Sequence, residues 1–155
     1  MRPNWDEYFL GMLDGVAKRA TCDRGRSGAI ITSRRRTILT TGYVGSAPGD
    51  EHCDEAGHYM ITVIQPDGTT SQHCDRTIHA EENAILQAAM DGVALRGATI
   101  YCTMVPCFRC ARRIIRVGIK RVVAQKAYQT DRQSRERFIR AGVELVVAND
   151  SVGKY

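Results

Sequence analysis

The sequence predicts an α/β fold with three layers, in which helices cover both faces of a five-stranded mixed sheet. Two strand-like runs, Gly28–Thr32 and Thr37–Val44, flank a short polar turn and predict an antiparallel hairpin at one edge. In the second half, strands alternate with helices, which is typical of parallel strands joined by helical crossovers. With 43% hydrophobic and 25% charged residues, the stretch 1–155 is expected to form one globular domain.

The first half of the chain combines one helix, the hairpin and a long polar segment. Apolar residues recur with a helical period between Trp5 and Ala20, so we expect a helix there. The segment Gly45–Gln72 is rich in Gly, Asp, His and Pro. It is predicted to be a loop with a short hairpin around Pro66–Gly68.

The second half is predicted to contain three helices and three strands. The first of these helices is alanine-rich and is followed by Gly92, a residue type that commonly ends helices. Pro106 suits the start of the next helix, and Gly118 suits its end. The expected elements are the helix His79–Asp91, the strand Ala98–Thr103, the helix Cys107–Val117, the strand Arg121–Gln125, the helix Arg132–Arg140 and the strand Val143–Ala148.

The charge balance is positive, with 22 Lys and Arg against 17 Asp and Glu and a net charge of +5. Such a balance suits a phosphate-bearing substrate or a nucleic acid, and equally a charged surface that aids solubility. The triplet Arg34–Arg36 lies between the two hairpin strands, so we interpret it as a solvated loop.

The cysteine content points to metal binding. No apolar run approaches membrane-spanning length, and the segment Met1–Leu10 lacks the basic and apolar regions of a signal peptide. We therefore expect a cytoplasmic protein. Cysteines in a reducing compartment, with Cys53 and Cys74 each directly following a histidine, indicate metal ligands rather than disulfides.

A catalytic zinc site is predicted where two helices begin. His79 opens one helix, and Cys107 and Cys110 lie on one face of the first turn of another. Zinc prefers four ligands, so one histidine and two cysteines leave a position open for water, as in catalytic sites. Glu81 follows His79 by two residues and is predicted to carry protons rather than to bind the metal.

This His-x-Glu and Pro-Cys-x-x-Cys pattern is typical of zinc deaminases. A Cys-x-x-Cys pair alone is equally compatible with a zinc ribbon or with buried cysteines. Its combination with His79 and Glu81 about 30 residues upstream, and with Pro106 directly before the first cysteine, favours the catalytic interpretation.

Over nearly its whole length the sequence resembles the deoxycytidylate (dCMP) deaminase family of the cytidine deaminase superfamily. The zinc pattern marks the superfamily, and the segments around it indicate the family. These segments are Arg2-Pro3-x-Trp5-Asp6-Glu7-Tyr8-Phe9, Thr21-Cys22, Arg26-Ser27-Gly28-Ala29, Thr41-Gly42-Tyr43, His73-Cys74-x-Arg76-Thr77-x-His79-Ala80-Glu81, Asn83-Ala84-Ile85, Gly97-Ala98-Thr99 and Gly118-Ile119-Lys120-Arg121-Val122-Val123.

The resemblance implies a cytidine-deaminase-like fold and the hydrolysis of dCMP to dUMP and ammonia, which supplies dUMP for thymidylate synthesis. A zinc-activated water would attack C4 while Glu81 moves protons. The backbone near Ala80 and Pro106 is expected to hold the base, Arg26 to meet the 5′-phosphate, and Tyr128 to line the nucleotide pocket. Without the resemblance, Arg26 would be interpreted as a surface residue and Tyr128 as a residue that packs in the core.

Val44 departs from the family pattern. The family has Gly-Tyr-Asn-Gly where this chain has Gly42-Tyr43-Val44-Gly45, and the asparagine of related deaminases contacts the sugar. Because valine makes no side-chain hydrogen bond, we expect the recognition of the sugar to differ from that of the family at this position. Alternative substrates are therefore another free cytosine nucleotide, such as dCTP or a modified dCMP. A tRNA adenosine deaminase and a non-catalytic zinc module that senses nucleotides are further alternatives.

The resemblance also implies a second, structural zinc, self-association and regulation. Cys22, Cys53, His58 and Cys74 could complete a Cys3His site that orders the long polar segment, with His52 and His73 as rival ligands and free thiols as the alternative. Cys102 is expected in the core. The family is commonly hexameric, activated by dCTP and inhibited by dTTP, so a hexamer or dimer with these effectors is expected. A membrane partner is not expected, and nucleic acid is disfavoured as a partner.

Overall fold

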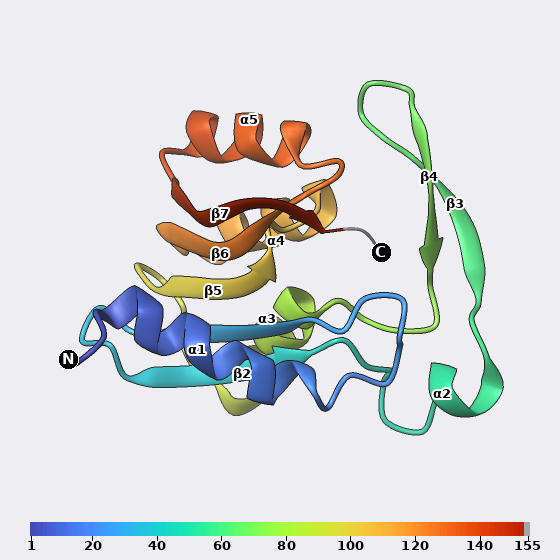
Figure 1. Ribbon diagram of the computed structural model, residues 1–155, viewed down its shortest axis with the longest axis horizontal. Helices are drawn as coiled ribbons and strands as arrows, with labels where there is room; N and C mark the ends of the chain where they lie inside the picture. Colours follow the sequence, from blue (N-terminus) through green and yellow to red (C-terminus); the bar gives the residue numbers. More distant parts are fainter. Residues whose placement is uncertain (154–155) are drawn as a thin grey trace.

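The computed structural model of the chain describes residues 1–153, and Figure 1 shows its arrangement. Five strands form the main sheet, and a separate two-stranded hairpin stands at one end of it. The elements are α1 (Trp5–Ala17), β1 (Gly28–Thr32), β2 (Ile38–Tyr43), α2 (Cys53–Ala56), β3 (Met60–Ile64), β4 (Thr70–Cys74), α3 (Ala80–Asp91), β5 (Thr99–Met104), α4 (Phe108–Arg116), β6 (Arg121–Tyr128), α5 (Arg132–Ala141) and β7 (Glu144–Gly153).

The main sheet is mixed, as the sequence predicts. Its strand order is β2-β1-β5-β6-β7. The hairpin β1–β2 is antiparallel, β1 is also antiparallel to β5, and β5, β6 and β7 run parallel. Helices α4 and α5 are the crossovers that parallel strands require, so the β-strand-to-helix alternation of the second half follows directly from the topology.

Helices cover both faces of the sheet, which confirms the three-layer prediction. Side chains of a strand alternate between its two faces, and here each face has its own apolar core. On one face, Phe9 and Leu13 of α1 pack against Ile30, Tyr101 and Val123. On the other face, α3, α4 and α5 pack against the strand residues of opposite parity. The buried helix side chains of that second core are Ala80, Ala84, Ala88, Ala111, Ile114 and Phe138.

The prediction that Gly45–Gln72 is a loop is wrong for much of the segment. It contains the short helix α2 and the β3–β4 hairpin, whose turn includes the predicted Pro66–Gly68. The hairpin pairs with no strand of the main sheet, and many of its side chains are exposed. Strand β4 is largely polar and lacks the apolar alternation from which a half-buried strand is recognised, whereas β3 is a short apolar run that carries a strand signal.

Two strands run longer than the sequence predicts. The apolar runs end at Gln125 and Ala148, but parallel pairing of β6 with β7 continues past a bulge to Tyr128 and Gly153. Backbone pairing alone carries this extension, so side-chain patterning gives no signal for it. No helix within residues 1–153 is long and apolar enough to cross a membrane.

Candidate metal and active site

Two helix N-termini meet at the predicted zinc site. His79 is the N-cap residue of α3, and Cys107 is the N-cap residue of α4, which follows β5 directly. Cys110 lies in the first turn of α4. Unpaired N–H groups and the positive dipole ends of both helices thus point toward these side chains, which favours thiolates there. The chain runs from α3 through β5 to α4, and the starts of the two helices lie side by side. Residues about 30 positions apart in the sequence therefore meet at one point.

The donor atoms of these three residues have the spacing of a tetrahedral zinc site. The distance from His79 Nδ1 to the Sγ atom is 3.5 Å for Cys107 and also for Cys110. Zinc bond lengths of about 2.0–2.1 Å to nitrogen and 2.3 Å to sulfur at tetrahedral angles give an N···S edge of about 3.5 Å. The donor set therefore fits zinc without rearrangement and could supply three of its four ligands.

Glu81 lies in the first turn of α3 and is buried, with 2% of its surface exposed. Burial raises the pKa of its carboxyl to about 7, although the charge of His79 partly opposes this. A carboxyl that titrates near neutrality both accepts and donates protons readily. The environment of Glu81 therefore suits the predicted proton carrier.

His79 and Cys107 form a charge-coupled pair. Burial lowers the pKa of His79, but the Cys107 sulfur and the Glu81 and Glu82 carboxylates outweigh it and raise that pKa to about 9. The Cys110 thiol and the His79 ring hold the pKa of Cys107 well below its ordinary value. The site thus stabilises a thiolate, which is the metal-binding form of cysteine.

A cavity of about 250 Å³ opens on the donor atoms. Its walls come from the β3–β4 hairpin, the segment before α3, the start of α4 and the loop after β6. Its lining residues are Ile61, Val63, Gln65, His73, Cys74, Asp75, Thr77, Ile78, His79, Glu82, Cys107, Phe108, Arg109, Cys110, Arg113 and Thr130. The β3–β4 hairpin is therefore one wall of the candidate active site, a role that the sequence did not predict for it.

The structure brings some of the expected substrate residues to this region and leaves others apart. Val44 is 5% exposed and lines a small adjoining pocket that also reaches His79. Ala80, Pro106 and Tyr128 are buried around the site without lining either pocket, and Tyr128 packs in a cluster with Cys107 and Cys110. Arg26 is exposed and lines neither pocket.

The sequence did not assign three further polar residues to the active site, although it left His73 as a rival ligand of the second zinc. Arg24 and His73 line the small pocket with Val44, and His73 and Arg109 line the larger cavity. Arg24 had a signal, because it lies between Cys22 and Arg26, both of which were singled out. Arg109 lies within the Cys-x-x-Cys sequence itself, and it lines the same cavity as the two cysteines.

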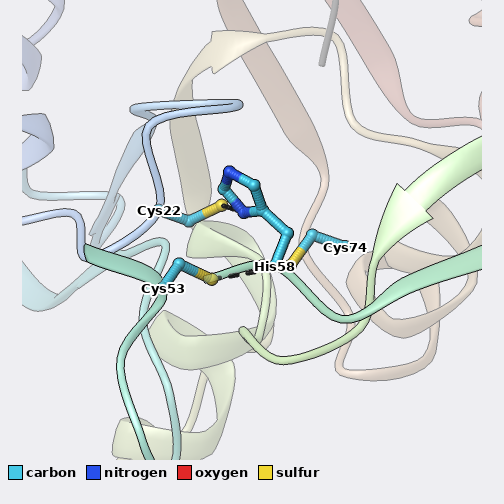
Figure 2. A group of neighbouring side chains, drawn as sticks. All are labelled: Cys22, Cys53, His58 and Cys74. Atoms are coloured by element: carbon cyan, nitrogen blue, oxygen red, sulfur yellow. Dashed lines mark hydrogen bonds between the residues drawn. The ribbon is translucent and has the colours of Figure 1, made fainter. Parts of the chain in front are cut away.

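A second cluster of donor atoms lies where Cys22, Cys53, His58 and Cys74 converge (Figure 2). The Cys22 Sγ is 3.6 Å from His58 Nδ1, and the Cys53 Sγ is 3.5 Å from the Cys74 Sγ. The other ring nitrogen of His58, Nε2, lies 3.0 Å from the Asp23 carboxylate. All four donor atoms lie within 4.8 Å of one another, as a Cys3His zinc site requires.

The rival ligands lie outside this cluster. His52 caps the start of α2, and His73 lines the active-site cavity. Cys102 is fully buried in β5, as expected of a core residue. None of the six cysteines forms a disulfide in the structure.

Fold and site together define a class of protein. A three-layer α/β domain that presents His79, Cys107 and Cys110 from two helix starts, beside a buried glutamate and a cavity, is a zinc-dependent deaminase. The comparison with family models gives the same answer over residues 3–126, which match the "Cytidine and deoxycytidylate deaminase zinc-binding region". The chain belongs to this family, as its resemblance predicts, and it is an enzyme of that class.

Relatives of known name cover most of the chain, and several of them are deoxycytidylate deaminases. The chain is 42% identical to the ComE operon protein 2 of Bacillus subtilis over 93% of its own length and 71% of that protein. It is 38% identical to the deoxycytidylate deaminase of Mycobacterium phage D29 over 81% of its own length and 97% of that protein. Other relatives are longer: the chain spans 44% of the deoxycytidylate deaminase of Schizosaccharomyces pombe.

A solved structure of the same fold is the dCMP deaminase of the cyanophage S-TIM5, in complex with dCMP and dUMP. It is 26% identical to this chain, with a TM-score of 0.73, and the match covers 94% of this chain and 97% of that protein. The cytidine-deaminase-like fold is therefore confirmed.

Proposed function

We propose that this chain hydrolyses dCMP to dUMP and ammonia, and so supplies dUMP for thymidylate synthesis. Relatives that cover most of this chain are named deoxycytidylate deaminases, and a structure of the same fold binds dCMP and dUMP. The observation that carries the proposal is the three-donor site with its buried carboxyl neighbour, Glu81, at the cavity that would hold the base.

The reaction adds water across C4 of the cytosine ring and releases the 4-amino group. When bound by His79, Cys107 and Cys110, zinc supplies Lewis acidity that activates the water. Glu81 accepts one proton from the water and delivers it to the ring nitrogen N3 as the C4–O bond forms. It then accepts the second proton from the hydroxyl now on C4 and passes it to the amine, so that the C4–N4 bond breaks, the C4 carbonyl forms and ammonia leaves.

The test of this proposal is the Glu81→Gln variant, which preserves shape and removes the titratable group. We expect it to keep its zinc and its fold and to lose about 10³-fold or more in turnover of dCMP, measured as released ammonia. Turnover close to that of the unmodified chain would refute the role of Glu81. Absence of dCMP turnover in the unmodified zinc-loaded chain would refute the proposed substrate.

Val44 makes the preferred nucleotide a separate question. Its apolar side chain borders the pocket near His79, so it offers no hydrogen bond where related deaminases have an amide. A panel of dCMP, dCTP, a modified dCMP, cytidine and a tRNA anticodon stem-loop ranks the candidates by kcat/KM. We expect dCMP to rank first, and activity on the RNA alone would contradict the proposal.

Two arginines are candidates for binding the 5′-phosphate of the substrate. Arg26 is the residue that the family resemblance indicates, and it stays a prediction, whereas Arg24 lines the small pocket beside Val44 and His79. Comparing Arg24→Ala with Arg26→Ala separates the two. The variant that loses the phosphate contact should show a KM for dCMP raised by about 10-fold to 100-fold, with KM for deoxycytidine little changed.

We also propose that Cys22, Cys53, His58 and Cys74 hold a second, structural zinc. Their donor spacing supports this, and the ring of His58 is oriented by Asp23 in the way that carboxylates orient metal-binding histidines. The site would tie the segment between α1 and β1, helix α2 and the β3–β4 hairpin together. Metal analysis of the pure protein should return two zinc ions per chain, and one ion per chain would refute the second site.

Self-association and regulation complete the proposal. Leu86 and Met90 on α3 are 44% and 79% exposed and border a large surface hollow with Tyr43, which supports burial against another copy of the chain. Sedimentation equilibrium should give a dimer or hexamer, and Leu86→Lys should dissociate it. Assays with dCTP and dTTP test whether these nucleotides activate and inhibit as in the family. A cytoplasmic location stays a prediction.

A further inference from the structure

Three polar side chains form a chain of hydrogen bonds along the inner face of the β3–β4 hairpin. The Gln65 Nε2 donates to the Ser71 Oγ at 2.7 Å, and the Ser71 Oγ lies 2.8 Å from the His73 Nε2. Val63 pairs with Ser71 and Ile61 pairs with His73 across the hairpin, so the chain runs along the strands toward the donor atoms.

This chain is partly buried and ends at the active-site cavity. Gln65 is 5% exposed, and both Gln65 and His73 line the cavity. The ring of His73 lies 6.4 Å from the ring of His79, at an interplanar angle of 23°. His73 also lines the small pocket with Arg24 and Val44, so it stands where the two pockets adjoin.

With the Gln65 amide oriented so that its Nε2 faces Ser71, the directions of these bonds place the His73 ring hydrogen on Nδ1. A carboxamide nitrogen only donates, so Ser71 accepts from Gln65 and keeps its own hydroxyl hydrogen to donate. Within residues 1–153 the Ser71 side chain has no partners besides Gln65 and His73, so that hydrogen goes to the His73 Nε2. Nε2 is then the acceptor, and the ring hydrogen is on Nδ1.

We propose that Gln65 and Ser71 are positioning residues that hold His73 as its Nδ1–H tautomer in the wall of the active-site cavity. His73 thereby presents an N–H donor to an acceptor oxygen of the nucleotide. The substrate part of this inference rests on the proposed function, whereas the tautomer does not. A donor that is fixed before binding costs less ordering entropy when the substrate arrives, so the effect falls on KM.

The hairpin contains a matched control on its opposite face. There the Gln72 Nε2 donates to the Thr62 Oγ1 at 2.7 Å, and both residues are exposed. Thr62→Ala therefore removes an equivalent amide–hydroxyl bond from the same pair of strands without touching the cavity.

The experiment combines nitrogen-15 NMR of the histidine rings with steady-state kinetics on the zinc-loaded protein. His73→Asn assigns the His73 signals among the four histidines. We expect the Nδ1–H tautomer in the unmodified chain and a mixture of tautomers in Ser71→Ala. We also expect Ser71→Ala to raise KM for dCMP about fivefold to tenfold with kcat little changed, Thr62→Ala to change neither, and Ser71→Thr to restore the unmodified behaviour.

Two results would overturn the inference: an Nε2–H tautomer in the unmodified chain, or a Ser71→Ala variant with unchanged tautomer and KM. The NMR measurement on the unmodified chain is independent of whether any variant folds. It is also independent of turnover, so a failure of the proposed function and a failure of this inference are distinguishable.

Discussion

Gly42 provides a test of how closely β2 and α3 must approach. A Cβ atom built on Gly42 would lie 2.3 Å from the carbonyl oxygen of Ala80 and 2.5 Å from the backbone nitrogen of Ala84. Both contacts are with the backbone of α3, which cannot rotate away as a flexible side chain can. Gly42→Ala therefore forces α3 away from the sheet or deforms β2.

The size of the effect follows from this geometry. Real Cβ contacts are essentially never shorter than 3.0 Å, so the 2.3 Å contact requires a retreat of at least 3.0 − 2.3 = 0.7 Å. Overpacking against backbone on this scale should cost about 3 kcal/mol, the upper end of the usual range. For a domain of this size that lowers Tm by about 6–12 °C. Because Glu81 moves with α3 relative to α4, we expect dCMP turnover to fall about 10-fold to 100-fold.

The assay is thermal unfolding followed by circular dichroism, together with dCMP turnover, on Gly42→Ala and a control glycine. Gly15 lies in α1, and a Cβ there meets no atom within 4 Å. Gly15→Ala should therefore stabilise the helix by about 0.5–1 kcal/mol and leave turnover unchanged. If Gly42→Ala unfolded within about 1 °C of the unmodified chain and retained its activity, the close approach of α3 and β2 would not exist as described.

Two other contacts lead to further predictions. Asp6 binds Arg121 through two bonds of 2.7 Å, and the Arg121 guanidinium lowers the pKa of Asp6. Its stabilising effect is therefore complete above the unfolded-state pKa of about 4 and is lost as pH falls through the lower folded-state value. Asp6→Asn should lower the free energy of unfolding by about 1–2 kcal/mol at pH 7, measured by urea unfolding. It should also weaken the loss of stability on the acid side of the pH profile. A profile as steep as that of the unmodified chain would contradict this. The Asn83 side chain donates to the carbonyl oxygens of Tyr43, Gly45 and Ile78. Asn83→Ala should therefore lower the free energy of unfolding by about 1–3 kcal/mol, measured by urea unfolding. A loss below about 0.5 kcal/mol would mean that these bonds do not hold the segments before α3 and after β2 together.

The metal site was more predictable than the cavity around it. His79, Cys107 and Cys110 are recognisable because few residue types bind zinc, and short spacings on a helix start place them on one side. The cavity depends on Ile61, Val63 and other hairpin residues that are ordinary in type and far from the ligands in sequence. Such residues acquire a role only from where the chain folds, so no local pattern marks them.

The second metal cluster was only partly predictable from the sequence. Its cysteines stood out as residues that the first site left unused, yet their partner could have been His52, His58 or His73. The choice of His58 depends on a turn that brings its Nδ1 to within 3.6 Å of the Cys22 sulfur, with Asp23 on the other side of the ring. Side-chain direction of this kind is set by tertiary packing rather than by spacing.

By itself the sequence predicted the fold class, the order of most strands and helices along the chain, and a candidate zinc site with a proton carrier beside it. These features follow from periodicity, helix-end signals and rare ligand chemistry, all of which are local. Only the tertiary structure decided that the segment after β2 forms a wall of the active site, that Arg24 rather than Arg26 borders the pocket, and that Gln65 and Ser71 reach His73. These features depend on contacts between segments distant in sequence, where polar side chains meet because the backbone brings them together.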